Sequence, residues 1–357
     1  MSEKHKFIHN LLTTEHLDAS LVFGRADLRY LCGFSGSDGV LFFSNHRTIF
    51  LTDSRYLQQA RQEVDADEVR CYKNKLQALA DLVEETGSRQ VAFDARRLSV
   101  SQYLELQRLC PSAVTFSPLT EQWESLRGIK QPAEIAFLKQ AADLNRRAFD
   151  ATLPVIRAGV RERDIALELE FNLKKIGGEI NSFDFIVASG WRGALPHGVA
   201  SDKLIAEGEL VTLDFGTRLG GYHSDETVTL AVGSVDGKLR QIFDIVIEAH
   251  DSAIAAARPG MRARELDAVA RDLITEKGYG DFFGHGLGHG IGLEVHEFPT
   301  LTGKSDTVLT SGMVVTIEPG IYLPDLGGVR IEDTILITEK GHECLTSIPK
   351  HYRQLSP

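Results

Sequence analysis

The feature that most constrains the fold is a run of nine residues, 284–292, that contains five glycines and two histidines. Each glycine in a helix interior costs roughly 1 kcal/mol relative to alanine, so this run cannot form a stable helix. Glycine instead permits unusual backbone dihedrals and a close approach to another group. With His285 and His289 on such backbone, a ligand-binding turn is one interpretation, and a surface loop with chance histidines is the other. The rest of the sequence is needed to distinguish these two interpretations.

The charge of the chain argues against two classes of partner. It carries 50 acidic and 39 basic residues, for a net charge of -11. Nucleic acids and anionic membranes attract basic surfaces, so we expect neither as the main partner. No apolar run approaches the ~20 residues that span a bilayer, and residues 1–6 are polar rather than the apolar core of a signal peptide. The four cysteines are widely spaced, which favours reduced thiols, and we expect a cytoplasmic protein.

The pattern of helices and strands predicts two domains. At 357 residues the chain is long enough for both. In residues 1–125, short apolar runs predict strands at 19–24, 40–43, 48–52 and 90–94, and helical spacing appears at 54–64, 76–85 and 101–109. The polar residues 44–47 predict a hairpin turn between the second and third strands. This alternation places helices against a mixed sheet, in an α/β domain.

One charged group in this first domain, Asp38, Asp53 and Arg55, has two interpretations. It is either a charged site or a solvated edge with structural ion pairs, and the second is favoured for isolated charged residues.

Residues 126–357 form the second predicted domain. A long helix begins at Lys130, with Pro132 and Glu134 in its first turn, where both are favoured. Further helices are predicted at 164–176, 242–257 and 264–276, and a strand at 183–188.

The first of two predicted hairpins brings together aspartates. Strands at 210–216 and 222–230 flank Leu219-Gly220-Gly221, and glycine there suits a tight turn. A turn centred between Leu219 and Gly220 places Asp214 directly opposite Asp225, with Cβ atoms about 4.5–5.5 Å apart. A bulge would shift this register.

The second predicted hairpin brings together glutamates. Strands at 313–318 and 328–337 flank a loop at 324–327. Centring the loop on Asp325 places Glu318 opposite Glu332.

Facing carboxylates inside apolar strands repel one another and lose hydration. A single pair is tolerated at a wet edge, but two pairs together with a histidine-bearing turn favour metal binding. Oxygen ligands with one imidazole suit Mn²⁺, Co²⁺, Fe²⁺ or Zn²⁺, and four carboxylates match the charge of two divalent ions. The alternative, an acid/base pair as in glycosidases, leaves two acids and the histidines unexplained.

With these residues identified, the second region resembles the metal-dependent pita-bread peptidases, and specifically their proline-directed branch of Xaa-Pro aminopeptidases (aminopeptidase P) and Xaa-Pro dipeptidases (prolidases). The matching residues are Ser189-Gly190-Trp191-Arg192, Ala194-Leu195-Pro196-His197-Gly198, Leu213-Asp214-Phe215-Gly216, Ser224-Asp225, Gly288-His289-Gly290-Ile291-Gly292, His296-Glu297, Ile317-Glu318-Pro319-Gly320 and Gly328-Val329-Arg330-Ile331-Glu332-Asp333. The first region resembles, more weakly, the creatinase-like N-terminal domain of the same branch, through Arg29-Tyr30-Leu31 and Thr52-Asp53-Ser54-Arg55-Tyr56.

The resemblance implies a fold and a metal centre. It implies a creatinase-like α/β domain over residues 1–125 and a pita-bread catalytic domain over 126–357, α/β (α+β) overall. It also implies two divalent ions, most often Mn²⁺, with Co²⁺ or Zn²⁺ as alternatives. Their ligands would be Asp214, Asp225, His289, Glu318 and Glu332, with Asp225 and Glu332 bridging.

The resemblance further implies how the site acts. His197, His296 and Arg330 would line the substrate site, and Glu318 would accept a proton from the attacking water. His296 would stabilise the oxyanion or help to protonate the proline nitrogen, and His197 would contact the substrate. The expected partners are peptides with proline second, and members of this size are commonly homodimers.

Two departures from the family pattern bear on the substrate. Val228 stands where the branch often has arginine, which removes a charge near the site. Thr300 stands where small prolidases often carry an arginine that meets the dipeptide carboxylate, and this favours an Xaa-Pro aminopeptidase over an Xaa-Pro dipeptidase. A methionine aminopeptidase is disfavoured, because those enzymes lack the N-terminal domain and the Arg-Ile-Glu-Asp motif at residues 330–333. Creatinases and pseudopeptidases, which bind without a metal centre, lack the acidic ligands.

Overall fold

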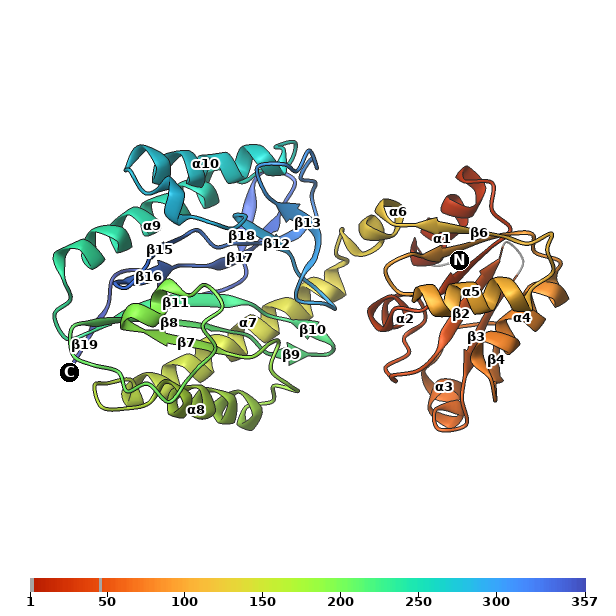
Figure 1. Cartoon of the computed structure of the whole chain (residues 1–357), viewed down its shortest axis with the longest axis horizontal. Coiled ribbons are helices and arrows are strands. Elements are labelled where there is room, and N and C mark those ends of the chain that lie inside the picture. Colours follow the sequence, from red (N-terminus) through yellow and green to blue (C-terminus); the bar gives the residue numbers. More distant parts are fainter. Residues whose placement is uncertain (1–2, 45–46) are drawn as a thin grey trace. The chain divides into compact units, whose positions relative to one another are not determined.

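The computed structural model describes residues 3–44 and 47–357. The chain divides into two compact units, one that ends at Leu126 and one that runs from Arg127 to Pro357 (Figure 1). The boundary expected from the sequence, after residue 125, lies one residue before this division. Both units combine helices with sheets, so the predicted mixed α/β class is confirmed.

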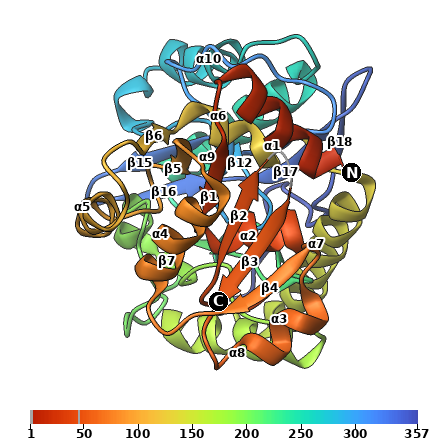
Figure 2. The same ribbon diagram turned by 90° about the vertical axis from the view of Figure 1, so that its right-hand side faces the viewer.

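The N-terminal unit is built on one mixed sheet of six strands in the order β4-β3-β2-β1-β5-β6. Its strands are β1 (Ala19–Val22), β2 (Val40–Ser44), β3 (Thr48–Thr52), β4 (Glu68–Cys71), β5 (Gln90–Asp94) and β6 (Thr115–Leu119). Its helices are α1 (Glu3–Thr14), α2 (Arg25–Cys32), α3 (Leu57–Glu63), α4 (Lys75–Thr86), α5 (Val100–Leu109) and α6 (Glu121–Glu124). The predicted hairpin is β2-β3, which is antiparallel, and its turn residues Asn45 and His46 lie outside the described residues. Figure 2 shows β1 to β4 side by side.

The core of this unit lies between the sheet and helices α4 and α5. Leu79 and Val83 of α4 and Leu106 of α5 are fully buried against alternate strand residues such as Leu21 and Phe42. Side chains on alternate strand positions face the same side of a sheet, so one apolar face meets the helices.

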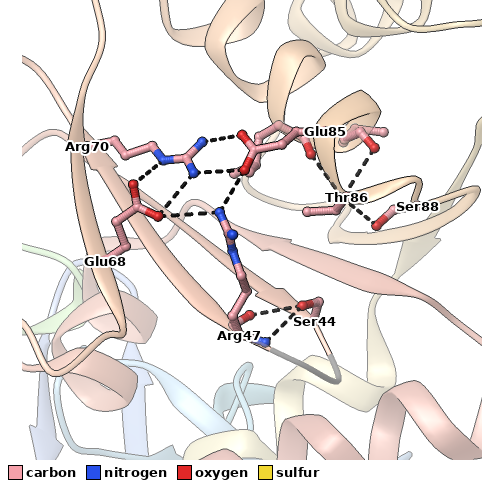
Figure 3. A network of polar contacts seen from close by, with 9 residues as sticks. Ser44, Arg47, Glu68, Arg70, Glu85, Thr86 and Ser88 are labelled. Atoms are coloured by element: carbon pink, nitrogen blue, oxygen red, sulfur yellow. Dashed lines mark hydrogen bonds and ion pairs between the residues drawn. The ribbon is translucent and has the colours of Figure 1, made fainter.

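Strand β4 was not predicted because it is a partly exposed edge strand without an apolar alternation. It is lined by charge instead. Arg70 contacts Glu68 and Glu85 at 2.6 Å each, and Arg47 reaches the same two glutamates at 3.3 and 2.9 Å (Figure 3). Charged side chains on an edge strand discourage pairing with another chain, and exposed ion pairs add only about 0–1 kcal/mol each.

The C-terminal unit places strands between two pairs of helices (Figure 1). Its helices are α7 (Pro132–Thr152), α8 (Glu162–Lys175), α9 (Gly237–Ala256) and α10 (Ala263–Glu276), with short 3-10 turns η1 (Ser125–Arg127, which straddles the unit boundary), η2 (Leu153–Val155), η3 (Gly190–Ala194) and η4 (Gly280–Phe282). Its strands are β7 (Ile186–Ser189), β8 (Glu209–Phe215), β9 (Arg218–Leu219), β10 (Tyr222–His223), β11 (Glu226–Val232), β12 (Gly288–Gly290), β13 (Glu297–Leu301), β14 (Val314–Ile317), β15 (Gly320–Leu323), β16 (Gly327–Arg330), β17 (Asp333–Ile337), β18 (His342–Cys344) and β19 (Gln354–Leu355).

Two main sheets make up this unit, β19-β11-β8-β7 and β13-β12-β14-β17-β18. Buried residues of α7 and α8, such as Phe149 and Leu169, pack on the first sheet. Buried residues of α9 and α10, such as Phe243 and Leu266, pack in the cluster that holds the second. The helices therefore cover the outer faces of the strands. Within residues 3–44 and 47–357, no helix combines the length and the apolar character needed to cross a bilayer.

Candidate metal centre

The first hairpin has a different register from the predicted one. Thr227, not Asp225, lies opposite Asp214, because the turn is centred on Gly220-Gly221, with Tyr222 paired to Leu219. Both glycines have positive φ, 58° and 87°, as a two-residue type I′ turn requires. The predicted direct pair of Asp214 and Asp225 is therefore wrong. The observed partner of Asp214, Thr227, lies two residues beyond the predicted partner, Asp225. Because this shift is an even number of residues, both aspartates still lie on the same face of the hairpin.

The second hairpin has the predicted register. Ile317 pairs with Asp333 in β14-β17, and Gly320 pairs with Arg330 in β15-β16. Glu318 and Glu332 lie between these two ladders, and continuing the same pairing of residues places them opposite each other. The turn passes through Asp325, which has a positive φ of 63°.

The glycine-rich run supplies the third segment of the site. Residues Gly288–Gly290 form β12, an antiparallel neighbour of both β13 and β14. A Cβ atom on Gly288 would clash with the carbonyl oxygen of Thr316, and one on Gly290 with that of Phe298. The glycines thus let β12 lie close against its neighbours and hold His289 beside the end of β14.

These segments converge on one cavity of about 420 Å³ in the C-terminal unit. All the predicted site residues line it: His197, Asp214, Asp225, His289, His296, Glu318, Arg330 and Glu332. The structure therefore brings together residues that are up to 135 positions apart in the sequence, from His197 to Glu332.

The carboxylates at the bottom of this cavity fit a cation. Asp225 and Glu332 are 5% and 1% exposed. Single ligand atoms from Asp225, His289 and Glu332 all lie within 4.8 Å of one another. Asp214 Oδ1 and Glu332 Oε1 are buried and accept no hydrogen bond from any residue that the structure describes. Buried carboxylate oxygens without a donor are costly, and a bound cation would satisfy them.

The crowding of these acids changes their pKa values. Burial, followed by the charges of Glu332, Asp214 and Glu318, raises the pKa of Asp225 well above its ordinary value. Burial, then Glu318 and Asp214, does the same to the pKa of Glu332. Burial also raises the pKa of Glu318 to about 7, although Arg330 opposes the change. Without a cation these acids therefore hold their protons to a higher pH than ordinary carboxyl groups do.

We predict that Glu318→Gln stabilises the metal-free protein at pH 8. Between its ordinary pKa of 4.5 and about 7, the folded chain keeps a proton on Glu318 that the unfolded chain has lost. The contribution of Glu318 to the free energy of unfolding therefore falls as pH rises from 4.5 to about 7, and it is constant at higher pH. An amide removes a penalty on the order of 3 kcal/mol at pH 8. Thermal unfolding in chelator should show a raised Tm at pH 8 and little change at pH 4.5, and a lowered Tm at pH 8 would contradict the prediction.

His289 presents its Nε2 atom to the acids. Its Nδ1 lies 3.1 Å from the carbonyl oxygen of Gly290, which only accepts, so Nδ1 carries the proton. Nε2 lies 3.3 Å from Glu318 Oε1 and 3.7 Å from Asp225 Oδ2. A neutral imidazole with one nitrogen fixed by a backbone carbonyl is the arrangement typical of a metal-ligating histidine.

Arg330 is the one cation among the predicted residues, and it is fully enclosed. Its Nη2 donates to Asp214 Oδ2 at 2.5 Å, and its Nη1 donates to Tyr322 Oη at 2.9 Å. Tyr322 in turn lies 2.8 Å from His285 Nε2. His285 therefore shapes the arginine's surroundings through Tyr322.

His197 and His296 are exposed at the cavity wall. The ring of His296 lies 4.3 Å from that of His289, and burial, then His289 and His197, lowers its pKa. Both histidines are free to contact a molecule in the cavity.

The sequence reasoning missed two threonines that orient the acids. Thr227 Oγ1 donates to Glu332 Oε2 at 2.6 Å, and Thr316 Oγ1 donates to Glu318 Oε1 at 3.1 Å. Thr227 follows Asp225 by two residues and Thr316 precedes Glu318 by two, so the period of two in a strand was a usable signal. Val228 packs instead in the buried cluster with Leu213 and Phe215, away from the acids.

The charged group of the N-terminal unit forms ion pairs. Arg55 contacts Asp53 at 2.6 Å and Asp38 at 3.5 Å, and Lys75 also pairs with Asp38. This agrees with the structural interpretation of Asp38, Asp53 and Arg55.

Comparison with known proteins places this architecture in a family. Residues 136–339 match the model of metallopeptidase family M24, and residues 5–129 match the creatinase/prolidase N-terminal domain. The chain is 38% identical to the Xaa-Pro dipeptidase of Pyrococcus furiosus over 97% of its own length and 98% of the relative's.

Solved structures agree. An Xaa-Pro dipeptidase from Bacillus anthracis is 44% identical with a TM-score of 0.96, covering 99% of both chains. An X-Pro aminopeptidase from Thermotoga maritima MSB8 is 38% identical with a TM-score of 0.91, covering 98% of this chain and 99% of that one.

Proposed function

We propose, from the premise that the chain belongs to metallopeptidase family M24, that it hydrolyses the peptide bond between an N-terminal residue and a following proline in dipeptides. The observation that carries the proposal is the convergence of four carboxylates and one imidazole on a single cavity. The names of the relatives supply the preference for proline.

Five residues would hold two divalent ions: Asp214, Asp225, His289, Glu318 and Glu332. Asp225 and Glu332, the most enclosed of the acids, would lie between the ions. Oxygen-rich ligands with one imidazole suit Mn²⁺, Co²⁺, Fe²⁺ or Zn²⁺. The family resemblance favours Mn²⁺, with Co²⁺ and Zn²⁺ as alternatives. When bound, the ions would supply Lewis acidity that activates water and polarises the scissile carbonyl.

The protein's own groups would then direct the protons. Glu318, which lines the cavity, would accept a proton from the attacking water while the oxygen of that water bonds to the carbonyl carbon of the substrate. That proton would pass to the proline nitrogen as the carbon–nitrogen bond breaks. His296 would stabilise the developing oxyanion or help this transfer, His197 would contact the substrate, and Arg330 would hold Asp214 and offer charge to a substrate carboxylate.

This proposal of an Xaa-Pro dipeptidase replaces the preference for an Xaa-Pro aminopeptidase that Thr300 suggested in the sequence. The relatives named above include Xaa-Pro dipeptidases from Pyrococcus furiosus and Bacillus anthracis, which supports that activity. The second candidate, an Xaa-Pro aminopeptidase, is supported by the Thermotoga maritima structure and by Thr300 itself. Hydrolysis of Ala-Pro and Ala-Pro-Ala in Mn²⁺ tests the proposal: faster cleavage of the tripeptide would replace it with the second candidate.

We predict that Thr300→Arg increases the preference for dipeptides. Thr300 is exposed on the cavity wall, so a guanidinium there can pair with the C-terminal carboxylate of a dipeptide. We expect the ratio of kcat/KM for Ala-Pro over Ala-Pro-Ala to rise about tenfold, the equivalent of one such contact. Thr310→Arg, at an exposed position outside the cavity, is the matched control. An unchanged ratio in Thr300→Arg would remove residue 300 from the substrate site.

A binding protein without a metal centre is the candidate from another class. Metal analysis after purification in Mn²⁺ separates the two, because a chain without bound metal or activation would be a binding module. The identity of the metal, a homodimeric assembly and a cytoplasmic location stay predictions.

A further inference from the structure

The residues that follow the two proposed bridging ligands meet a common cation. Glu226 follows Asp225 at the start of β11, and Asp333 follows Glu332 at the start of β17. Consecutive strand residues point to opposite faces, so these two acids point away from the cavity. Lys350 Nζ lies 2.7 Å from Glu226 Oε1 and 3.4 Å from Asp333 Oδ1. One lysine of the C-terminal segment thus contacts the strands of both ligands from behind.

This contact is enclosed and has several further partners. The side chain of Lys350 is 8% exposed and that of Glu226 is 0% exposed. Glu226 Oε1 also accepts from the backbone N–H of Ile348, and Asp333 Oδ1 accepts from Thr346 Oγ1 at 2.6 Å. On the α9 side, His250 Nε2 lies 3.3 Å from Asp333 Oδ2, and its Nδ1 lies 3.0 Å from Asp251.

The two strands are also joined directly at the level of the ligands. Thr334 Oγ1 donates to the carbonyl oxygen of Asp225 at 3.0 Å, and the N–H of Glu332 donates to that of Thr227 at 3.1 Å. A change in the spacing of β11 and β17 therefore moves Asp225 relative to Glu332. A buried ion pair contributes little net stability, and its best-attested use is to fix one arrangement.

We propose that Lys350 is a positioning residue for the metal centre: by binding Glu226 and Asp333 together, it sets the separation of the carboxylates of Asp225 and Glu332. The proposal rests on the proposed function, since it needs these acids to bind metal. It gives the C-terminal segment a part in metal affinity, although it contributes no residue to the cavity.

Lys350→Met tests the proposal, because it keeps the apolar stem and removes the cation. The readouts are the affinity for Mn²⁺ by isothermal titration and the visible absorption spectrum of the Co²⁺-loaded protein. We expect the Mn²⁺ affinity to fall about 10–100-fold, as for other residues that orient metal ligands, and the Co²⁺ bands to shift. Lys350→Arg should retain most of the affinity. Lys340→Met, at an exposed position, is the matched control.

The double variant Glu226→Gln/Lys350→Met separates positioning from a loss of folding caused by an unpaired charge. It removes one charge of each sign, so it should fold even if Lys350→Met does not, and it should show the same loss of affinity. Wild-type affinity and an unshifted Co²⁺ spectrum in either folded variant would overturn the proposal and leave Lys350 a structural anchor. Failure of the wild-type protein to bind metal would instead overturn the proposed function.

Discussion

Replacement of Glu318 by alanine is expected to abolish peptide hydrolysis while leaving the fold intact. Glu318 is the proposed proton acceptor and one of the proposed ligands, so the substitution removes both contributions. Loss of a general base alone costs about 10²–10⁴-fold in rate. With the loss of a ligand, we expect kcat/KM for Ala-Pro to fall by at least about 10³-fold.

The fold should survive because in the metal-free protein the cost of burying the Glu318 carboxylate outweighs its favourable contacts. Its side chain contacts Thr316 Oγ1 and lies near His289, and its charged form is disfavoured by burial. Circular dichroism and the Tm in chelator should match or exceed those of the wild type. Glu339→Ala, at an exposed glutamate, serves as the control for a general loss of activity. Near-wild-type turnover in Glu318→Ala would refute the role of this residue.

The sequence allowed one of the two carboxylate hairpins to be placed correctly, and the reason is the turn. Asp325 lies at the centre of its loop, and counting outward from it gives the observed opposition of Glu318 and Glu332. In the first hairpin the predicted centre of the turn lies one residue before the observed centre, because either glycine of Gly220-Gly221 suits a tight turn. Only the requirement for positive φ at both central positions decides the register.

Other parts of the site depend on contacts that no local pattern contains. Arg330 meets Asp214 and Tyr322, and Lys350 meets Glu226 and Asp333, across separations of up to 124 residues. In the N-terminal unit, the exposed strand β4 lacks the apolar alternation on which the prediction depended. The helix α2 has helical apolar spacing at Leu28, Leu31 and Cys32, but its eight residues are too few for periodicity to distinguish a helix from a short buried segment. Apolar patterns identify what is buried, whereas the pairing of buried polar groups is fixed by the tertiary structure.

Removal of metal is expected to abolish activity and to lower the Tm, with a stronger effect at pH 8 than at pH 6. Asp225, Glu332 and Glu318 all have raised pKa values, so in the metal-free protein they either repel one another or hold protons. A cation relieves the repulsion but must displace those protons, which makes its binding weaker at low pH. At a metal concentration of 100 Kd the gain in stability is about 2.7 kcal/mol. Thermal unfolding with chelator and with graded Mn²⁺, at both pH values, measures this.

Asp225→Asn distinguishes metal binding from a general effect of salt on the protein. The amide removes the charge of the most crowded aspartate and keeps its volume, so the variant should gain little Tm from Mn²⁺ while its metal-free Tm at pH 8 rises above that of the wild type. Asp272→Asn, at an exposed aspartate of α10 outside the Lys350 contact, should keep the full response to Mn²⁺. If Mn²⁺ raised the Tm of Asp225→Asn as much as that of the wild type, the ions would bind elsewhere, and the cavity would lose its assignment as the metal centre.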